Sequence, residues 1–212
     1  MMTKAFSAEF FPDLLAGMLV NFEIAAIALI IGLALGALLG MVRLGGGVMG
    51  TVAISLIGLM RAAPTFVVMF FLLNIIPRDA TLLGVGVAPS GIMTVALSLV
   101  PYAASYVADN GAEALKQLRA GSPLGALQFL PNITRAFFVL VMSSSAGAAI
   151  GVTEGIAVIL REAVLLPSLG DKLILYATGI LFFGIALQGG FALIRWLQRH
   201  LGQRATRDEP GI

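Results

Sequence analysis

Five apolar stretches, each about as long as a helix that crosses a lipid bilayer, dominate this sequence of 212 residues. A helix needs about 20 apolar residues to cross a hydrocarbon core of about 30 Å. Charged residues make up only 11% of the chain, against about 25% in a typical water-soluble domain. We therefore predict an all-α membrane protein with about five transmembrane helices in a single transmembrane domain over residues 1–212. The stretches cover approximately residues 14–42, 48–76, 92–108, 136–160 and 173–194.

The first stretch is predicted to be a retained helix. It is too long for a signal peptide, it contains Asn21 and Glu23, and no basic start or small-residue cleavage site accompanies it. It follows an N-terminal segment over residues 1–13. Glu23 lies two turns into this stretch. Two interpretations of this residue remain: an interfacial position at the membrane surface, or a functional role.

Basic residues predict the orientation. With five spans, the first and third connections share a side with the C-terminal tail, and these segments carry eight Lys and Arg residues against four on the other side, with Arg61 left out as intramembrane. Cytoplasmic connections are enriched in such residues. We therefore expect the N-terminus outside, and a connection over residues 110–135 and a tail over residues 198–212 in the cytoplasm. His200 lies in this tail and is expected to be solvated.

Gly32, Gly36 and Gly40 recur every fourth residue in the first stretch. This spacing places them on one face of a helix, where the backbone of a neighbouring helix can approach closely. They predict helix packing and carry no information about a ligand.

Polar residues of the fourth stretch are candidates for a substrate path. A charged group at mid-bilayer costs roughly 2.5–3.5 kcal/mol, so Glu154 is expected to face a cavity or a partner. Steps of three and four residues place Ser143, Gly147, Gly151 (or Ile150) and Glu154 on one face of a helix. An interfacial Glu154 paired with Arg161 is the alternative. A path-lining Glu154 would favour cationic or zwitterionic amino compounds. The substrate-path candidates are Glu154, Thr153, Ser143, Gly147, Gly151 and Arg61.

Arg61 and Pro64 lie inside the second stretch. Proline removes a backbone hydrogen bond and bends a helix, which membranes tolerate where protein or a cavity covers the bend. Arg61 one turn earlier is expected to reach the cytoplasmic interface with its long side chain, or else to pair inside the bundle. The first alternative is favoured.

Four segments, in serial order, resemble the permeases of polar-amino-acid ABC importers, the inner-membrane subunits of binding-protein-dependent uptake systems. The segment Gly58–Thr65 is similar to that family's Phe-Arg-Gly-Thr-Pro segment, and Ser105–Asp109 to its Ala-Tyr-x-Ala-Glu pattern. The segments are Leu14–Arg43, Gly58–Phe71, Ala96–Asp109 and Leu160–Leu165. The resemblance implies a type I ABC importer permease fold, in a multi-pass protein of the bacterial inner (cytoplasmic) membrane.

One segment departs from the family, in which a loop with Glu-Ala-Ala, a later Gly and Leu-Pro forms the coupling helix that docks on the ATPase. Counting along the chain places Gly125 at the glutamate and Pro131 at the glycine, and a rival register from Glu113 is one residue short. Glycine and proline cost about 1 and 3 kcal/mol inside a helix, so we expect a short, distorted or displaced coupling helix. The ATPase-coupling candidates are Leu124, Gly125, Ala126, Leu127, Phe129, Leu130 and Pro131, within 124–133 and flanked by Arg119 and Arg135.

The resemblance implies an ATP-driven importer subunit, for amino acids or related small polar solutes, that works by alternating access. Its partners would be a second permease chain (preferably different, forming a heterodimer), two ATPase subunits, an extracytoplasmic solute-binding protein and membrane lipid, without nucleic acid. The sequence has no phosphate-binding loop and no cysteine, so we expect no catalytic site, no metal and no cofactor here, with Mg-ATP held by the partner. The alternatives are a non-transporting membrane scaffold with a degenerate coupling loop and, less favoured, a channel.

Overall fold

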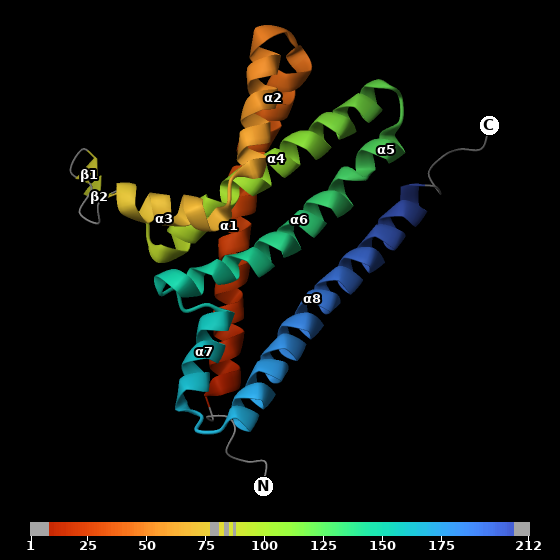
Figure 1. Cartoon of the computed structure of the whole chain (residues 1–212). Coiled ribbons are helices and arrows are strands. Elements are labelled where there is room, and N and C mark those ends of the chain that lie inside the picture. The colour runs from red at the N-terminus through yellow and green to blue at the C-terminus, as the bar shows by residue number, and fades with distance from the viewer. Residues whose placement is uncertain (1–8, 77–80, 83–84, 87, 206–212) are drawn as a thin grey trace.

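A computed structural model describes residues 9–76, 81–82, 85–86 and 88–205, and almost all of them are helical (Figure 1). The only strands among them form a small antiparallel hairpin that pairs Thr81 with Gly86. The predicted turn at Pro77–Asp79 lies outside the described residues. The elements are α1 (Phe10–Gly45), α2 (Gly47–Ala62), α3 (Thr65–Ile75), β1 (Thr81–Leu82), β2 (Val85–Gly86), α4 (Gly91–Arg119), α5 (Pro123–Leu127), α6 (Phe129–Ser143), η1 (Ser144–Ile150), α7 (Gly155–Leu165) and α8 (Leu169–Ala205).

The long helix α1 is the axis of the bundle, and α4 crosses it (Figure 1). The glycine face predicted from the sequence is confirmed at this crossing. Gly32 and Gly36 are buried, and a Cβ atom on Gly36 would lie 2.5 Å from the carbonyl oxygen of Ala104. Small residues on both helices therefore allow the two backbones to approach closely, as is common in membrane bundles.

The second apolar stretch is two helices, α2 and α3, that meet at an angle of 95°. The bend predicted from Pro64 is thus confirmed. Ala63 and Pro64 are extended, because proline disfavours the helical conformation of the residue before it. As Figure 1 shows, α2 lies along the upper part of α1, and α3 turns away from it.

The fourth stretch, predicted as one span over about 136–160, is not one helix, and this prediction is wrong. The α-helix α6 ends at Ser143 and is followed by the 3₁₀ helix η1, and Gly151 then adopts a left-handed conformation with φ 84°. The chain starts a new helix, α7, at Gly155. A left-handed residue ends a helix at low cost only when it is glycine, so Gly151 fixes the break.

In the described part of the chain, four helical segments can cross a membrane by length and composition, and the bent pair α2–α3 gives a fifth if it is counted as one span. The predicted all-α membrane fold with about five spans is confirmed in this respect. The fifth predicted span corresponds to α8, which packs against α6 and α7 (Figure 1). Few of its residues up to Ala192 are buried. The four segments are Phe10–Gly45, Gly91–Arg119, Gly125–Ile150 and Leu169–Ala192.

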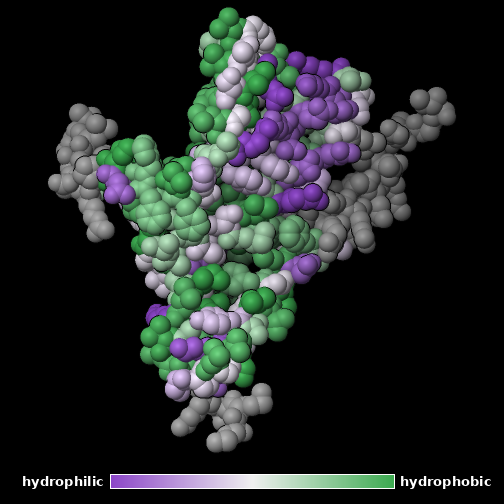
Figure 2. Space-filling model, in the orientation of Figure 1, coloured by the Kyte–Doolittle hydropathy of each residue, from purple (hydrophilic) through white to green (hydrophobic). Residues whose placement is uncertain are grey.

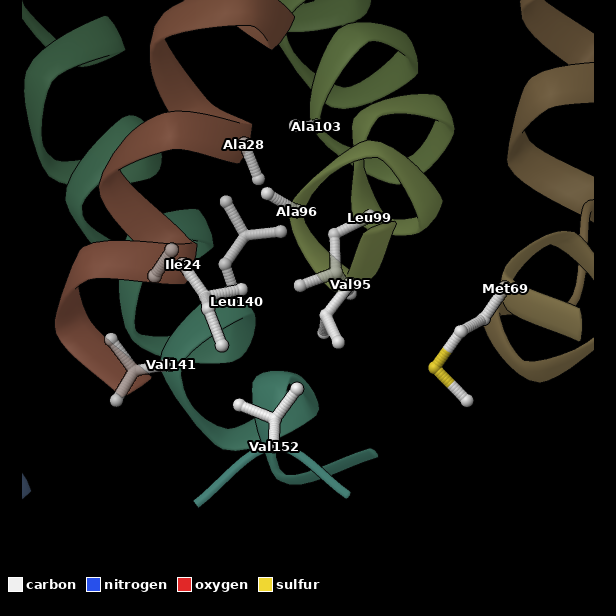
Figure 3. Close-up of a cluster of buried hydrophobic side chains, with 11 residues drawn as sticks. Ile24, Ala28, Met69, Val95, Ala96, Leu99, Ala103, Leu140, Val141 and Val152 are labelled. Carbon is white, nitrogen blue, oxygen red and sulfur yellow. The ribbon is translucent and has the colours of Figure 1, made fainter. Parts of the chain in front are cut away.

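The main apolar core lies where α1, α4 and α6 meet, and Val152 from the break after η1 closes its lower end (Figure 3). Ile24, Leu99 and Leu140 are almost completely buried in it. Met69 reaches this core from α3. On the face shown in Figure 2, apolar residues predominate, whereas hydrophilic residues gather over the second half of α4 and α5. Such a distribution fits a bundle in lipid with one polar end.

Candidate functional site

A buried polar network joins α1 to the break between η1 and α7. Glu154 is completely buried and is the N-terminal cap of α7. Its Oε1 accepts a hydrogen bond from the amide of Ala157 and its Oε2 one from the amide of Ile156, both at 2.9 Å. Amide groups at a helix N-terminus lack partners within the helix and carry a positive partial charge, so a carboxylate stabilises this end.

Asn21 on α1 completes the network with each of its polar atoms. Its Nδ2 donates to Glu154 Oε2 at 2.9 Å and to Ser144 Oγ at 2.8 Å. Its Oδ1 accepts from the amide of Gly155 at 3.0 Å. Gly17, one turn earlier on α1, allows the close approach, because a Cβ atom there would lie 2.8 Å from the carbonyl carbon of Glu154. The side chain of Asn21 therefore anchors the non-helical segment to α1.

The predicted polar stripe on one helical face does not form, because the chain leaves the helix after Ser143. Gly147 and Glu154 are buried, Ser143 is partly buried, and Gly151 and Thr153 are exposed. The alternative pairing of Glu154 with Arg161 is also wrong, since Arg161 forms an ion pair with Asp13. A solute could reach the Glu154 carboxylate only if α1 or α7 moved. The sequence signal that could have indicated the break is Gly151, with the second glycine Gly155 directly after Glu154.

Asp109 on α4 binds two arginines from different elements. Its Oδ1 accepts from Arg43 at the end of α1 at 2.7 Å, and its Oδ2 accepts from Arg61 in the last turn of α2. Arg61 thus pairs inside the chain, which is the alternative that the sequence favoured less. The sequence reasoning missed Asp109 as the partner of Arg61 and Arg43 as the second arginine on the same carboxylate, although Asp109 is the first charged residue of α4. The three side chains hold the α2–α3 bend against α1 and α4.

We expect the coupling between Arg61 and Asp109 to be small but measurable. Their side chains are 59% and 34% exposed, and pairs this exposed contribute about 0.2–1 kcal/mol. A double-mutant cycle with Arg61→Ala, Asp109→Ala and the double variant, read by thermal unfolding in detergent, should give a coupling energy in this range. Additive effects would show that the ion pair does not form.

The predicted coupling segment contains a short helix, α5, whose N-terminus is capped by Ser122. The proline penalty expected from the sequence does not apply. Helix α5 ends before Gln128, so Pro131 lies in the first turn of α6, where proline is tolerated. Leu127 and Leu130 are 52% and 56% exposed, and Phe129 is partly buried. Gly125 and Ala126 are partly buried in α5, and the side chain of Leu124 lies outside the described part.

A polar cavity of about 190 Å³ lies between α4 and the α5–α6 segment. Asn132 Nδ2 donates to Asn110 Oδ1 at 2.8 Å across it, and Gln117 donates to Glu113 along α4. The hydrogen bonds place α5 and the start of α6 beside the hydrophilic second half of α4 (Figure 2).

The described residues contain no group of three His, Cys, Asp or Glu side chains that could hold a metal. His200 lies in the part of α8 whose side chains are not described.

Comparison with known proteins supports the fold only. No protein-family model matches this chain, and no curated protein matches it. A solved structure, the "Crystal structure of an amino acid ABC transporter with histidines", superimposes with a TM-score of 0.62 and 16% sequence identity. The match covers 91% of this chain and 95% of that chain. The all-α membrane fold predicted from the apolar stretches is therefore confirmed, and the chain shares its fold with a chain of that transporter.

Proposed function

We propose that this chain is the transmembrane permease subunit of an ATP-driven importer that depends on a solute-binding protein. It moves amino acids or related small polar solutes by alternating access across a bacterial inner membrane. The observation that carries this proposal is the fold, which agrees over 91% of the chain with a chain of an amino acid ABC transporter. The order of the four resembling sequence segments supports it independently.

Partners supply what this chain lacks. ATP hydrolysis needs a phosphate-binding loop, which the sequence does not contain, so two ATPase subunits bind and hydrolyse Mg-ATP in this proposal. A second permease chain encloses the path, and a different partner chain is favoured because the coupling segment departs from the family pattern. The solute-binding protein delivers the solute from outside.

The coupling contact is proposed at residues 124–133, with Arg119 and Arg135 beside it. Leu127 and Leu130 are exposed. They belong to the α5–α6 segment, which lies beside the hydrophilic second half of α4 (Figure 2). Neighbouring apolar side chains on a polar surface are typical of a protein-binding site. The short helix α5 is therefore the element that an ATPase subunit contacts.

A non-transporting scaffold is the second candidate. The observation that favours it is the absence, at Gly125, of the glutamate that the family has in its coupling helix. A scaffold would retain the fold and bind partners without responding to solute. The two candidates therefore differ in their effect on ATP turnover.

The test is co-purification of the chain with its ATPase, followed by measurement of ATP turnover in lipid nanodiscs. We expect the loaded solute-binding protein to stimulate turnover, whereas unchanged turnover in an intact complex would favour the scaffold.

Replacing Leu127 and Leu130 by aspartate should abolish co-purification, because two charges would enter the contact. Leu169→Asp is the matched control, because Leu169 is 73% exposed at the start of α8 and should leave co-purification unchanged. Full retention of the ATPase by the double variant would contradict the proposed contact.

A further inference from the structure

Glu23 is a carboxylate on the exposed side of α1. In the part of the chain that the structure describes, it has no hydrogen-bond or ion partner. Asp13, Asp109 and Glu154 all have such partners. Glu23 therefore differs from these three acidic residues, because within the described part of the chain it forms no interaction that stabilises the fold.

Two ion pairs, one near each end of α1, mark the two membrane surfaces and so give the depth of Glu23 in the bilayer. Asp13 pairs with Arg161 near the start of α1, and Arg43 pairs with Asp109 near its end. Thirty residues separate Asp13 from Arg43, which at about 1.5 Å per residue is about 45 Å along the helix. This equals the thickness of a bilayer with its headgroups, of which the hydrocarbon core takes about 30 Å. Glu23 lies ten residues, or about 15 Å, from Asp13 and therefore inside the hydrocarbon core.

Glu23 points away from the buried network. Asn21, two residues earlier, is completely buried against Ser144 and Glu154, and two residues turn an α-helix by about 200°. The exposed residues one and two turns from Glu23 are apolar, with Leu19 at 63% and Ile30 at 67%. An ionised side chain that faces acyl chains is strongly disfavoured, so this face of α1 is turned to protein or to water.

Among the described side chains, a second copy of this chain offers no counter-charge at this depth. The guanidinium groups of Arg43 and Arg61 are held at Asp109, and that of Arg161 is held at Asp13. The other basic side chains that the structure describes lie in the last turn of α4, the first half of α6 and the first turn of α8. They are Lys116, Arg119, Arg135 and Lys172. Where a second copy of this chain is the neighbour, a mobile cation is therefore the partner that fits the Glu23 carboxylate best.

We infer that Glu23 lines the aqueous path between this chain and the second permease chain, where its carboxylate binds the cationic ammonium or guanidinium group of the solute. This inference rests on the proposed function and narrows its substrates to cationic and zwitterionic amino compounds. A carboxylate and an ammonium group form a charge-assisted hydrogen bond of about 2.7–2.9 Å. Glu23, rather than the buried Glu154, is then the residue that selects for charge.

The test uses the absence of cysteine from the sequence. In membranes that contain the whole transporter, Leu19→Cys introduces the only thiol of this chain one helical turn from Glu23. Water-soluble thiosulfonate reagents of opposite charge should both label it, with the cationic reagent about tenfold faster, as expected for unit charges about 6 Å from a carboxylate in water. Glu23→Gln in the same chain should remove this preference, and excess arginine should slow labelling only when Glu23 is present. Ala28→Cys, at a completely buried position, is the unlabelled control.

Two results would overturn the inference. A Leu19→Cys thiol that neither reagent labels would place this face in lipid or in a dry protein interface. Equal rates for the two reagents with Glu23 present would mean that the carboxylate does not act on the path. Labelling requires no ATP turnover, so a transporter whose ATPase responds to the solute-binding protein but whose thiol is not labelled would refute the inference and keep the proposed function.

Discussion

Gly36→Ala should lower the free energy of unfolding by about 1–3 kcal/mol or more, the usual cost of forcing extra atoms into a packed core. The added Cβ atom would lie 2.5 Å from the carbonyl oxygen of Ala104 and 2.6 Å from Cβ of Val107. The first of these is a backbone atom of a long helix, so it cannot move aside as the end of a flexible side chain can. Relief requires separation of α1 from α4, which form the central crossing of the bundle.

Denaturant titration of the detergent-solubilised protein measures this effect, and Gly184→Ala is the matched control. Gly184 lies on α8, where an added Cβ atom would meet no other atom within 4 Å. Alanine is favoured over glycine in helices by about 0.8–1 kcal/mol, so this variant should keep or slightly gain stability. Equal stabilities for the two variants would refute the close approach of α1 and α4.

Asn21→Leu is expected to have the second large effect, a loss of about 2 kcal/mol or more. The leucine side chain has the same number and branching of heavy atoms as asparagine, but it leaves the amide of Gly155 without its acceptor and removes a donor from Glu154. Each buried group left without a partner costs about 1–3 kcal/mol, and charged groups cost more. Side-chain hydrogen bonds between membrane helices average only about 0.6 kcal/mol, so the loss should exceed that average because a backbone amide and a carboxylate are both affected.

Asn74→Leu on α3 is the control for this prediction. Asn74 is exposed, and its Nδ2 donates to the carbonyl oxygen of Phe70 within the same helix. Its replacement should change the free energy of unfolding by less than about 0.5 kcal/mol. If Asn21→Leu proved as mild as Asn74→Leu in the same titration, the network would not anchor the break to α1.

Features that depend on local sequence were predictable here. The regular spacing of Gly32, Gly36 and Gly40 fixes a helical face whatever lies opposite, and proline bends a helix wherever it lies inside one. Both predictions therefore needed no knowledge of the partner element. Hydropathy alone likewise located the apolar stretches.

The break between η1 and α7 could not be found in the same way. The 3₁₀ helix before it consists of serine, alanine, glycine and isoleucine, and Gly151 and Val152 follow, so no charged residue interrupts the apolar stretch before Glu154. Glu154 is an unusual cap, because caps are commonly Ser, Thr, Asp or Asn. The sequence pattern therefore favours a continuous polar face that the chain does not form. The contact of Glu154 with Asn21 spans 133 residues, as the pairing of Arg61 with Asp109 spans 48, and such long-range contacts follow only from the fold.

Uptake by the purified complex tests the central claim most directly. The chain, its partner permease, the ATPase and the solute-binding protein would be studied in proteoliposomes with radiolabelled arginine, glutamine and glutamate in turn. We expect at least one of these amino acids to accumulate against its gradient only when Mg-ATP is present on the ATPase side. Equilibration of the label without ATP would indicate a channel, and no movement of any amino acid by an ATP-hydrolysing complex would contradict the assignment of this chain to amino-acid import.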